Sequence, residues 1–484
     1  MEMILEGLKP YNVFKYFEEL SSIPRETGNC KEISNYICEF AASHNLIYYR
    51  DDNDNVVIYK DSKSNPNGEP VILQGHMDMV CEKSFDYEAK HDFSKDGLKL
   101  SYLDDYIFAK GTTLGADDGI AIAYMLSILE DDSIKTPPIE ALFTVDEENG
   151  MKGAINFDAS VLKGKKLINL DHEVEGELLT CCAGGRRVKL RIPVKYSQKS
   201  GLCYSIIVCG LNGGHSGVEI DKGRGNANLL LGRMLHTISK NMNFDLKYLG
   251  GGLTDSAIPR EAKAEILIDS SSVDALEDIV EKYSHIICNE FEGIEDNMMI
   301  YCENKGEEEA LVLETNYKKQ IGFLLNTIPD GIIKMSRNNE GLVRTSLNCG
   351  IMKLDEEFFT LIVNLRSLAD SEKEALGDKI QYLIETIGGE YIIETDYPAW
   401  EYNENSPLRE LAFDVFQNKY CRNPKMKGFH AGLECGVLFG KIKDLDVLSF
   451  GPTIINIHTP KEKLSISSTE RTYDYLVSLL EALN

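Results

Sequence analysis

The chain has 484 residues, of which 43% are hydrophobic and 27% charged, and its formal net charge at pH 7 is −27. This length exceeds one core of ordinary size, so we expect two or three domains. The acidic charge argues against nucleic acids and anionic membranes as partners, because both need a basic surface. No apolar run approaches the roughly 18 residues of a membrane span, and MEMILEGLKP lacks the basic start of a signal peptide. Twelve cysteines without a C-x-x-C pair favour reduced thiols, and we expect a cytoplasmic protein.

The first 185 residues alternate between helix-like and strand-like stretches. Residues 10–23 and 31–45 have the apolar spacing of amphipathic helices, and residues 119–131 form a more uniformly apolar helix candidate. Short apolar runs predict four strands, at 55–60, 70–78, 139–148 and 166–173. Apolar strands alternating with helices are typical of a buried parallel or mixed sheet covered by helices. We therefore predict an α/β fold with a mixed sheet.

Polar side chains stand at the C-terminal ends of these predicted strands. His76 comes just after the run VILQ, Glu147 and Glu148 come after ALFTV, and Asp171 follows LINL. Because positions i and i+2 of a strand share a face, His76 and Asp78 are expected to point the same way. Sheets of this kind bind their ligands at the carboxyl edge of the strands. That edge is the candidate site.

A long insertion is predicted from residue 186 to residue 397, where strands of alternating polarity and long charged helices replace the earlier pattern. Residues 261–283 and 356–384 are each predicted to form a strand, a helix cap and an amphipathic helix. They are either two related α+β units or a chance similarity of common elements. After a helix candidate at 406–420, the segments 446–453 and 455–460 return to the first pattern. We predict a catalytic domain formed by residues 1–185 and 398–484, interrupted by an inserted domain over residues 186–397.

Five polar features together suggest a metal centre. They are His76 with Asp78, the pair Asp117 and Asp118 in GADDG, the pair Glu147 and Glu148 in DEENG, Asp171 in NLDHE, and His458 in NIHTP. Each alone would suit a solvated turn or strand end. Burying so many carboxylates at one edge without cations would be strongly repulsive. Two divalent ions that share a carboxylate would relieve this, and imidazole and carboxylate donors suit Zn²⁺, with Mn²⁺ or Co²⁺ as alternatives.

The motifs GHMDMV, GTTLGADDGI, DEENGM, NLDHE, GGHSGVEI and GPTIINIHTP resemble those of the dinuclear zinc exopeptidases of the carboxypeptidase G and aminoacylase type. Within that group, GGHSGVEI with GRGNAN and FHAGLECG is similar to the cytosolic nonspecific dipeptidases, also called aminoacyl-histidine or Xaa-His dipeptidases. The similarity runs essentially from end to end. It implies a mixed-sheet catalytic domain with an inserted α+β lid, and a metal-dependent dipeptidase that acts on unblocked dipeptides.

The resemblance also implies roles for the residues at the strand ends. His76 and Asp171 would bind one metal ion, Glu148 and His458 the other, and Asp117 would bridge the two. Glu147 would be the general base of catalysis. Asp78 would orient His76, as carboxylates behind a ligand histidine do. In this family the peptide bond after the bridging aspartate is cis, so we predict a cis bond between Asp117 and Asp118.

Substrate contacts are expected from residues outside the metal ligands. The resemblance implies that His215 stabilises the oxyanion of the tetrahedral intermediate. The alternative is a histidine with a structural role in its loop. Arg366 in VNLRS would bind the terminal carboxylate of the substrate, since a guanidinium matches that group; a surface arginine is nearly as plausible. His430 and Glu434 in FHAGLECG would lie near the site. Glu434 is a candidate for the α-ammonium group of the substrate, or a structural acid of the loop.

Two other functions stay open at this point. An N-acyl amino acid deacylase would use the same metal pair on an amide without a free amine. A non-catalytic binding protein on this scaffold is disfavoured, because Glu147 and all five ligand positions are retained. The insertion is about twice the size of a small α+β lid, so we also expect that it can mediate a homodimer.

Overall fold

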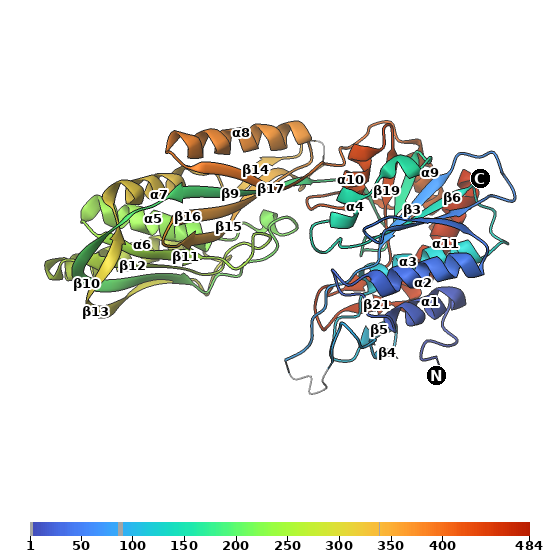
Figure 1. Ribbon diagram of the computed structural model, residues 1–484, viewed down its shortest axis with the longest axis horizontal. Helices are drawn as coiled ribbons and strands as arrows, with labels where there is room; N and C mark the ends of the chain where they lie inside the picture. Colours follow the sequence, from blue (N-terminus) through green and yellow to red (C-terminus); the bar gives the residue numbers. More distant parts are fainter. Residues whose placement is uncertain (1–2, 86–90, 338) are drawn as a thin grey trace. The chain divides into compact units, whose positions relative to one another are not determined.

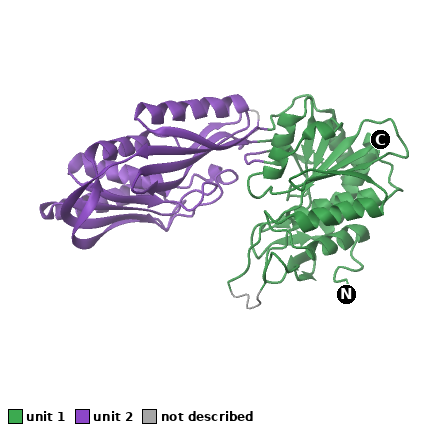
Figure 2. Ribbon diagram, in the orientation of Figure 1, with its two compact units in different colours: residues 1–182, 400–428, 433–484 green, residues 183–399, 429–432 purple. Residues whose placement is uncertain are grey.

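The computed structural model describes residues 3–85, 91–337 and 339–484 (Figure 1). The chain divides into two compact units (Figure 2). Unit 1 contains residues 1–182, 400–428 and 433–484, and unit 2 contains residues 183–399 and 429–432. Unit 1 is therefore built from both ends of the chain.

Unit 1 is organised around an eight-stranded mixed sheet. Its strands, in order across the sheet, are β1 (Ile47–Arg50), β2 (Val56–Lys60), β6 (Ile139–Thr144), β3 (Val71–His76), β7 (Lys166–Asn169), β19 (Asp446–Ser449), β8 (Glu177–Cys182) and β18 (Lys425–Phe429). β3 runs parallel to β6 and β7, and β19 runs parallel to β7. β1, β2 and β8 add antiparallel pairings. The predicted α/β class with a mixed sheet is confirmed.

Helices pack on this sheet because their apolar faces are covered there. They are α1 (Tyr11–Ser21), α2 (Lys31–Ser43), α3 (Ala116–Glu130), α4 (Lys152–Asn156), α9 (Pro407–Tyr420), α10 (Glu434–Lys441) and α11 (Ile466–Leu483). The amphipathic helices predicted at 10–23 and 31–45 are α1 and α2. α3 is apolar all round, and it is buried along nearly its whole length between β3 and α1.

A second, small sheet joins distant parts of unit 1. It has the order β20 (Ile454–Ile455), β21 (Lys463–Ser465), β5 (Tyr106–Ala109) and β4 (Leu100–Leu103). β5 lies shortly before α3, whereas β20 and β21 flank the turn that contains His458. The sheet thus attaches the His458 turn to the segment that leads into α3.

Unit 2 contains a nine-stranded antiparallel sheet with four helices. The strands are, in order, β13 (Met299–Leu313), β10 (Tyr196–Cys209), β12 (Ala262–Ile268), β11 (Asp245–Gly251), β15 (Val343–Leu354), β16 (Phe358–Ser367), β9 (Gly184–Pro193) and β17 (Glu390–Tyr397), with β14 (Gly331–Met335) paired to β15. The helices are α5 (Ala227–Asn241), α6 (Val273–Glu290), α7 (Thr315–Thr327) and α8 (Asp370–Thr386). The described residues also contain short 3-10 helices, at Ala159–Val161 in unit 1 and at Ile220–Lys222 and Ser270–Ser272 in unit 2.

Strand alternation gives the sheet of unit 2 two different faces. In β16, Phe359, Leu361, Val363 and Leu365 belong to the hydrophobic core, so Asn364 and Arg366 lie on the other face. Both strand–helix segments predicted in the insertion are present, as β12 followed by α6 and as β16 followed by α8. Among the described residues, no helix is long and apolar enough to cross a membrane.

Candidate metal centre

The predicted ligands meet at the carboxyl edge of the parallel strands. β3 ends at His76, Glu147 and Glu148 follow β6, and Asp171 follows β7. Since these three strands are neighbours and run in one direction, their C-terminal residues converge. Asp117 reaches the same place from the start of α3, and His458 from the turn between β20 and β21.

The side chains form two overlapping groups that share Asp117. His76 Nε2 lies 3.1 Å from Asp117 Oδ1 and 3.6 Å from Asp171 Oδ1. His458 Nε2 lies 3.0 Å from Asp117 Oδ2 and 2.9 Å from Glu148 Oε1. Within each group of three residues, the donor atoms lie within 4.8 Å of one another. Each oxygen of Asp117 therefore faces a different imidazole, as a bridging carboxylate would.

The electrostatics of the cluster suit cations. Burial raises the pKa values of Glu148 and Asp171, and the negative charge of Asp117 adds to both increases. Although burial opposes it, contacts with Asp117 and Glu148 raise the pKa of His458 to about 11. Carboxylates outnumber imidazoles in this cluster, so their charges repel one another, and the cluster offers the nitrogen and oxygen donors that divalent metals use. The residues present can hold metal ions.

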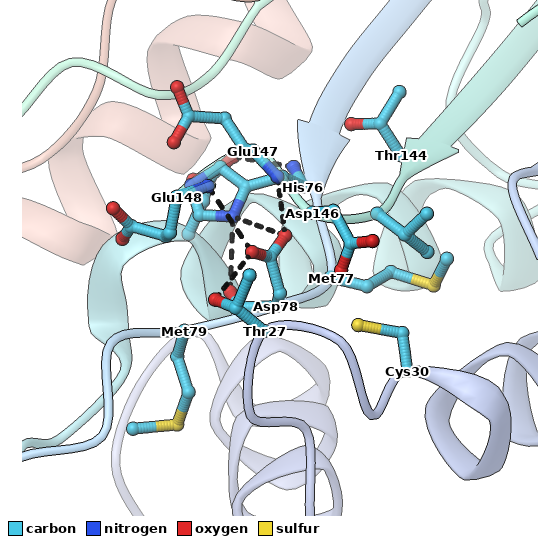
Figure 3. A network of polar contacts seen from close by, with 12 residues as sticks. Thr27, Cys30, His76, Met77, Asp78, Met79, Thr144, Asp146, Glu147 and Glu148 are labelled. Carbon is cyan, nitrogen blue, oxygen red and sulfur yellow. Dashed lines mark hydrogen bonds and ion pairs between the residues drawn. The ribbon is translucent and has the colours of Figure 1, made fainter. Parts of the chain in front are cut away.

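Asp78 contacts several of the candidate ligands and their neighbours. Its Oδ1 accepts the backbone N–H of Glu147 at 3.0 Å, and its Oδ2 accepts the N–H of Glu148 at 3.3 Å and the hydroxyl of Thr27 at 2.9 Å. His76 Nδ1 is 3.5 Å from Asp78 Oδ1 and 3.0 Å from the Asp78 carbonyl oxygen. Figure 3 shows Asp78 beneath the backbone of Glu147 and Glu148, whose side chains extend away from it. The carbonyl of Asp78, more closely than its carboxylate, orients the imidazole of His76.

Glu147 lies beside the ligands. One of its oxygens, His76 and Glu148 form a third group whose donor atoms lie within 4.8 Å of one another. Burial raises the pKa of Glu147, and the carboxylates of Glu148 and Asp171 add to the increase. The side chain is therefore one that can hold a proton more tightly than an exposed glutamate does.

The cis peptide bond predicted between Asp117 and Asp118 is present.

Glu434 is the first residue of α10 and is completely buried. Its Oε2 accepts hydrogen bonds from the hydroxyl of Thr144 at 2.6 Å and from the side-chain amide of Gln74. Burial raises the pKa of Glu434 to about 8. Both partners belong to the strands that end at the candidate site, so Glu434 supports the sheet from within.

In unit 2, His215 and Arg366 lie close together. A Cβ atom at Gly217 would be 3.0 Å from His215 Cε1 and 3.2 Å from Arg366 Nε. His215 Nδ1 accepts the backbone N–H groups of Gly217 and Val218, which leaves Nε2 as the protonated nitrogen. Arg366 is 6% exposed; its Nη1 donates to the Tyr397 hydroxyl, and its Nε has no hydrogen-bond partner among the described residues.

His430 joins this cluster in unit 2. Its Nε2 lies 2.7 Å from Ser346 Oγ. Burial and then the charge of Arg366 lower the pKa of His430 to about 3, which keeps the ring neutral. The positive charge of the cluster therefore rests on Arg366.

Two acids near the candidate ligands, Glu173 and Glu462, were not found from the sequence. Burial, together with Asp117 and Asp171, raises the pKa of Glu173 to about 8. Its position two residues after Asp171, in NLDHE, was the available signal. Among the described residues, the hydrogen-bond donors to Glu462 are the backbone N–H groups of residues 114–117, and such contacts leave no pattern of side chains in a sequence.

The chain was compared with known proteins. Residues 72–482 match the sequence profile of Peptidase family M20/M25/M40. The cytosol non-specific dipeptidase of Escherichia coli (strain K12) is 34% identical over 483 residues, which is 99% of each chain. The crystal structure of aminoacylhistidine dipeptidase from Vibrio alginolyticus has a TM-score of 0.86 and 34% identity, and the match covers 99% of this chain and 98% of that one. An aminopeptidase from Bacillus cereus shares the fold, with a TM-score of 0.57, 16% identity and coverage of 98% and 99%.

These matches confirm the resemblance inferred from the motifs. The carboxyl-edge cluster lies inside the matched region, and the similarity to the two dipeptidases extends over nearly the whole chain. The chain belongs to Peptidase family M20/M25/M40.

Proposed function

We propose that this chain is a metal-dependent dipeptidase that hydrolyses the peptide bond of unblocked dipeptides, including those of the Xaa-His type. The observation that carries the proposal is the pair of ligand groups that share Asp117. The proposal is supported by the names of the two proteins to which the chain is similar over its full length, a non-specific dipeptidase and an aminoacylhistidine dipeptidase.

The proposed centre holds two divalent ions. His76, Asp117 and Asp171 hold one, and Asp117, Glu148 and His458 hold the other. Zn²⁺ suits this mixture of imidazole and carboxylate donors, with Mn²⁺ or Co²⁺ as alternatives. When bound, such ions lower the pKa of a water molecule and polarise the scissile carbonyl group.

Glu147 is the proposed general base. It takes a proton from the attacking water and returns it to the leaving amine, which requires a carboxyl group whose affinity for protons is higher than usual. One oxygen of Glu147 lies within 4.8 Å of donor atoms of His76 and Glu148, so the carboxyl group is next to the proposed ions. Asp78 holds the backbone of Glu147 and the ring of His76, so it positions both the base and a ligand.

The substrate contacts are assigned to three further residues. His215 donates from Nε2 to the oxyanion, and Arg366 pairs with the terminal carboxylate, for which its unpartnered Nε is available. Glu434 is the candidate for the α-ammonium group through Oε1, which has no hydrogen-bond partner among the described residues, while Oε2 keeps its contacts with the sheet. Residues 1–185 and 398–484 are the proposed catalytic domain, and residues 186–397 the proposed lid, through which two chains pair. The proposed location is the cytoplasm.

The test is a comparison of free and N-acetylated dipeptides. We expect the purified protein, loaded in turn with Zn²⁺, Mn²⁺ and Co²⁺, to hydrolyse free dipeptides and to lose this activity when a chelator removes the ions. Hydrolysis of only the N-acetylated forms would identify a deacylase instead. If a broad dipeptide panel gives no turnover from protein with two bound ions, the proposal is wrong.

A further inference from the structure

Two buried charged residues, Arg25 and Glu462, bind backbone groups next to the candidate metal centre. Arg25 is in the turn that follows α1, and Glu462 is four residues after His458, just before β21. Their exposures are 3% and 2%. Neither residue belongs to the ligand groups.

Glu462 binds the segment that leads into α3. Its Oε2 accepts the N–H groups of Leu114 at 2.7 Å and Gly115 at 2.9 Å, and its Oε1 accepts those of Ala116 at 2.8 Å and Asp117 at 3.4 Å. The first N–H groups of a helix lack partners within the helix, and one carboxylate satisfies them here. Glu462 thereby fixes the backbone of Asp117 to the turn that carries His458.

Arg25 binds the same segment from the opposite side. Its Nη2 donates to the carbonyl of Gly115, while its Nη1 donates to the carbonyls of Met77 at 3.0 Å and Asp78 at 3.3 Å. The Asp78 carbonyl is also the group that orients His76. Gly115 therefore donates its N–H to Glu462 and accepts at its carbonyl from Arg25. A side chain at this position would collide with Arg25, because a Cβ atom there would lie 2.5 Å from Arg25 Nη2.

The pair therefore connects three separate ligand-bearing segments. Arg25 joins the end of β3 to the start of α3, and Glu462 joins the start of α3 to the His458 turn. Burial lowers the pKa of Arg25, and the charge of Glu462 opposes that decrease. Buried side chains that each bind several backbone groups hold those groups in one geometry.

We propose that Arg25 and Glu462 are positioning residues that fix the separation of His76, Asp117 and His458, and so set the affinity of the site for its two ions. This inference rests on the proposed metal centre. Neither residue touches the substrate or an ion. Residues behind metal ligands typically change metal affinity by about 10- to 100-fold, and we expect an effect of that size.

The matched control is Glu140, a second buried glutamate of unit 1 that binds only backbone. It is 3% exposed, and its Oε2 accepts the N–H groups of Lys163 at 2.9 Å and Gly164 at 3.0 Å. Glu140 lies near the start of β6, whereas the metal centre lies beyond the end of that strand. The same change to glutamine therefore has a similar structural cost at a place remote from the ligands.

The experiment compares Glu462→Gln with Glu140→Gln. Metal-free protein is titrated with Zn²⁺ in competition with a chromophoric chelator, and with Co²⁺ while its visible spectrum is recorded. Glu462→Gln replaces one acceptor oxygen by an amide nitrogen, which donates. The two buried N–H groups bound to that oxygen therefore lose their acceptor. We expect both variants to lower the melting temperature of the metal-free protein. Only Glu462→Gln should weaken metal binding about 10- to 100-fold and alter the Co²⁺ spectrum.

Arg25→Lys is the second variant, in case Glu462→Gln does not fold. A lysine keeps the charge but cannot spread its donors over three carbonyl groups as a guanidinium does. We expect weaker Zn²⁺ binding and a lower kcat with little change in KM. If the folded variants bind Zn²⁺ as tightly as the wild type and give the same Co²⁺ spectrum, the inference is wrong. This holds even if the wild-type protein hydrolyses dipeptides. Conversely, the inference survives if the unmodified protein binds two ions but cleaves no dipeptide.

Discussion

The carboxylate of Asp78 accepts the backbone N–H of Glu147 at 3.0 Å. Its second oxygen accepts the N–H of Glu148 at 3.3 Å, so one buried acid holds the backbone of the proposed base and that of a proposed ligand. Burial opposes ionisation, but hydrogen bonds with His76 and with the N–H of Glu147 lower the pKa of Asp78. Asp78 therefore stays an acceptor for both N–H groups.

Replacing Asp78 by asparagine should weaken metal binding. The amide nitrogen would face an N–H group, because each carboxylate oxygen already accepts one. We expect affinity for Zn²⁺ to fall about 10- to 100-fold, as measured by chelator competition. Thr27→Val, which removes only the hydroxyl donor, should have a smaller effect. Unchanged metal affinity in Asp78→Asn would contradict the role given to this residue.

Glu147→Gln should separate metal binding from catalysis. Glutamine keeps the size of the side chain but cannot accept the proton of the attacking water, so kcat should fall by about 10²- to 10⁴-fold. Metal content, measured on the same sample, should stay at two ions per chain. The comparison variant is Glu148→Gln, which should lose affinity for one ion. Loss of metal from Glu147→Gln would show that Glu147 is a ligand rather than the base.

Arg366 can be tested with substrates that differ only in the terminal carboxylate. Arg366→Met should lower kcat/KM for a dipeptide by about 10- to 100-fold, since a hydrogen bond to a charged group contributes about 1.5–3 kcal/mol. The matching dipeptide amide has no such carboxylate and should be cleaved equally by both proteins. An equal loss on both substrates would instead assign Arg366 a structural role.

The raised pKa of Asp330, in unit 2, should make the stability of the folded protein depend on pH. Its Oδ1 accepts from the Asn226 amide and from the N–H of Cys349. Burial raises the pKa of Asp330 to about 6. Because the folded protein binds this proton more tightly than the unfolded chain, stability falls as the pH rises from about 4 to about 6, by about 3 kcal/mol.

Asp330→Asn should remove this dependence. An asparagine can keep both hydrogen bonds through Oδ1 and carries no charge at any pH. We expect the variant to have a higher melting temperature than the wild type at pH 8, and a similar one at pH 4. Asp330→Ala, which lacks the acceptor, should be destabilised at both pH values. A melting temperature for Asp330→Asn below that of the wild type at pH 8 would show that the charged form is favoured.

The convergence of three candidate ligand residues could be predicted because they stand at strand ends, where position along the chain determines position in space. His76, Glu148 and Asp171 follow parallel strands, so adjacency of the strands brings them together. The Arg25–Glu462 pair was not predictable in this way. It acts on backbone groups of residues 114–117, about 350 positions from Glu462 in the case of Gly115, and backbone groups leave no pattern in a sequence.

The order of the strands was also beyond the sequence. β19 lies between β7 and β8, although more than 260 residues separate it from each along the chain. Likewise, Phe429–Gly432 pack with unit 2 while the residues on both sides belong to unit 1. No change in composition marks the position of β19 in the sheet or the packing of Phe429–Gly432 with unit 2. Both depend on long-range packing rather than on local propensity.

The pairing of β7 with β19 has a consequence for biosynthesis. On the ribosome, β3, β6 and β7 emerge long before β19, so the edge of β7 stays open while the whole insertion is translated. Such an edge can pair wrongly with other chains. His458 emerges later still, so a nascent polypeptide cannot complete the second candidate ligand group until the segment after β19 has been translated.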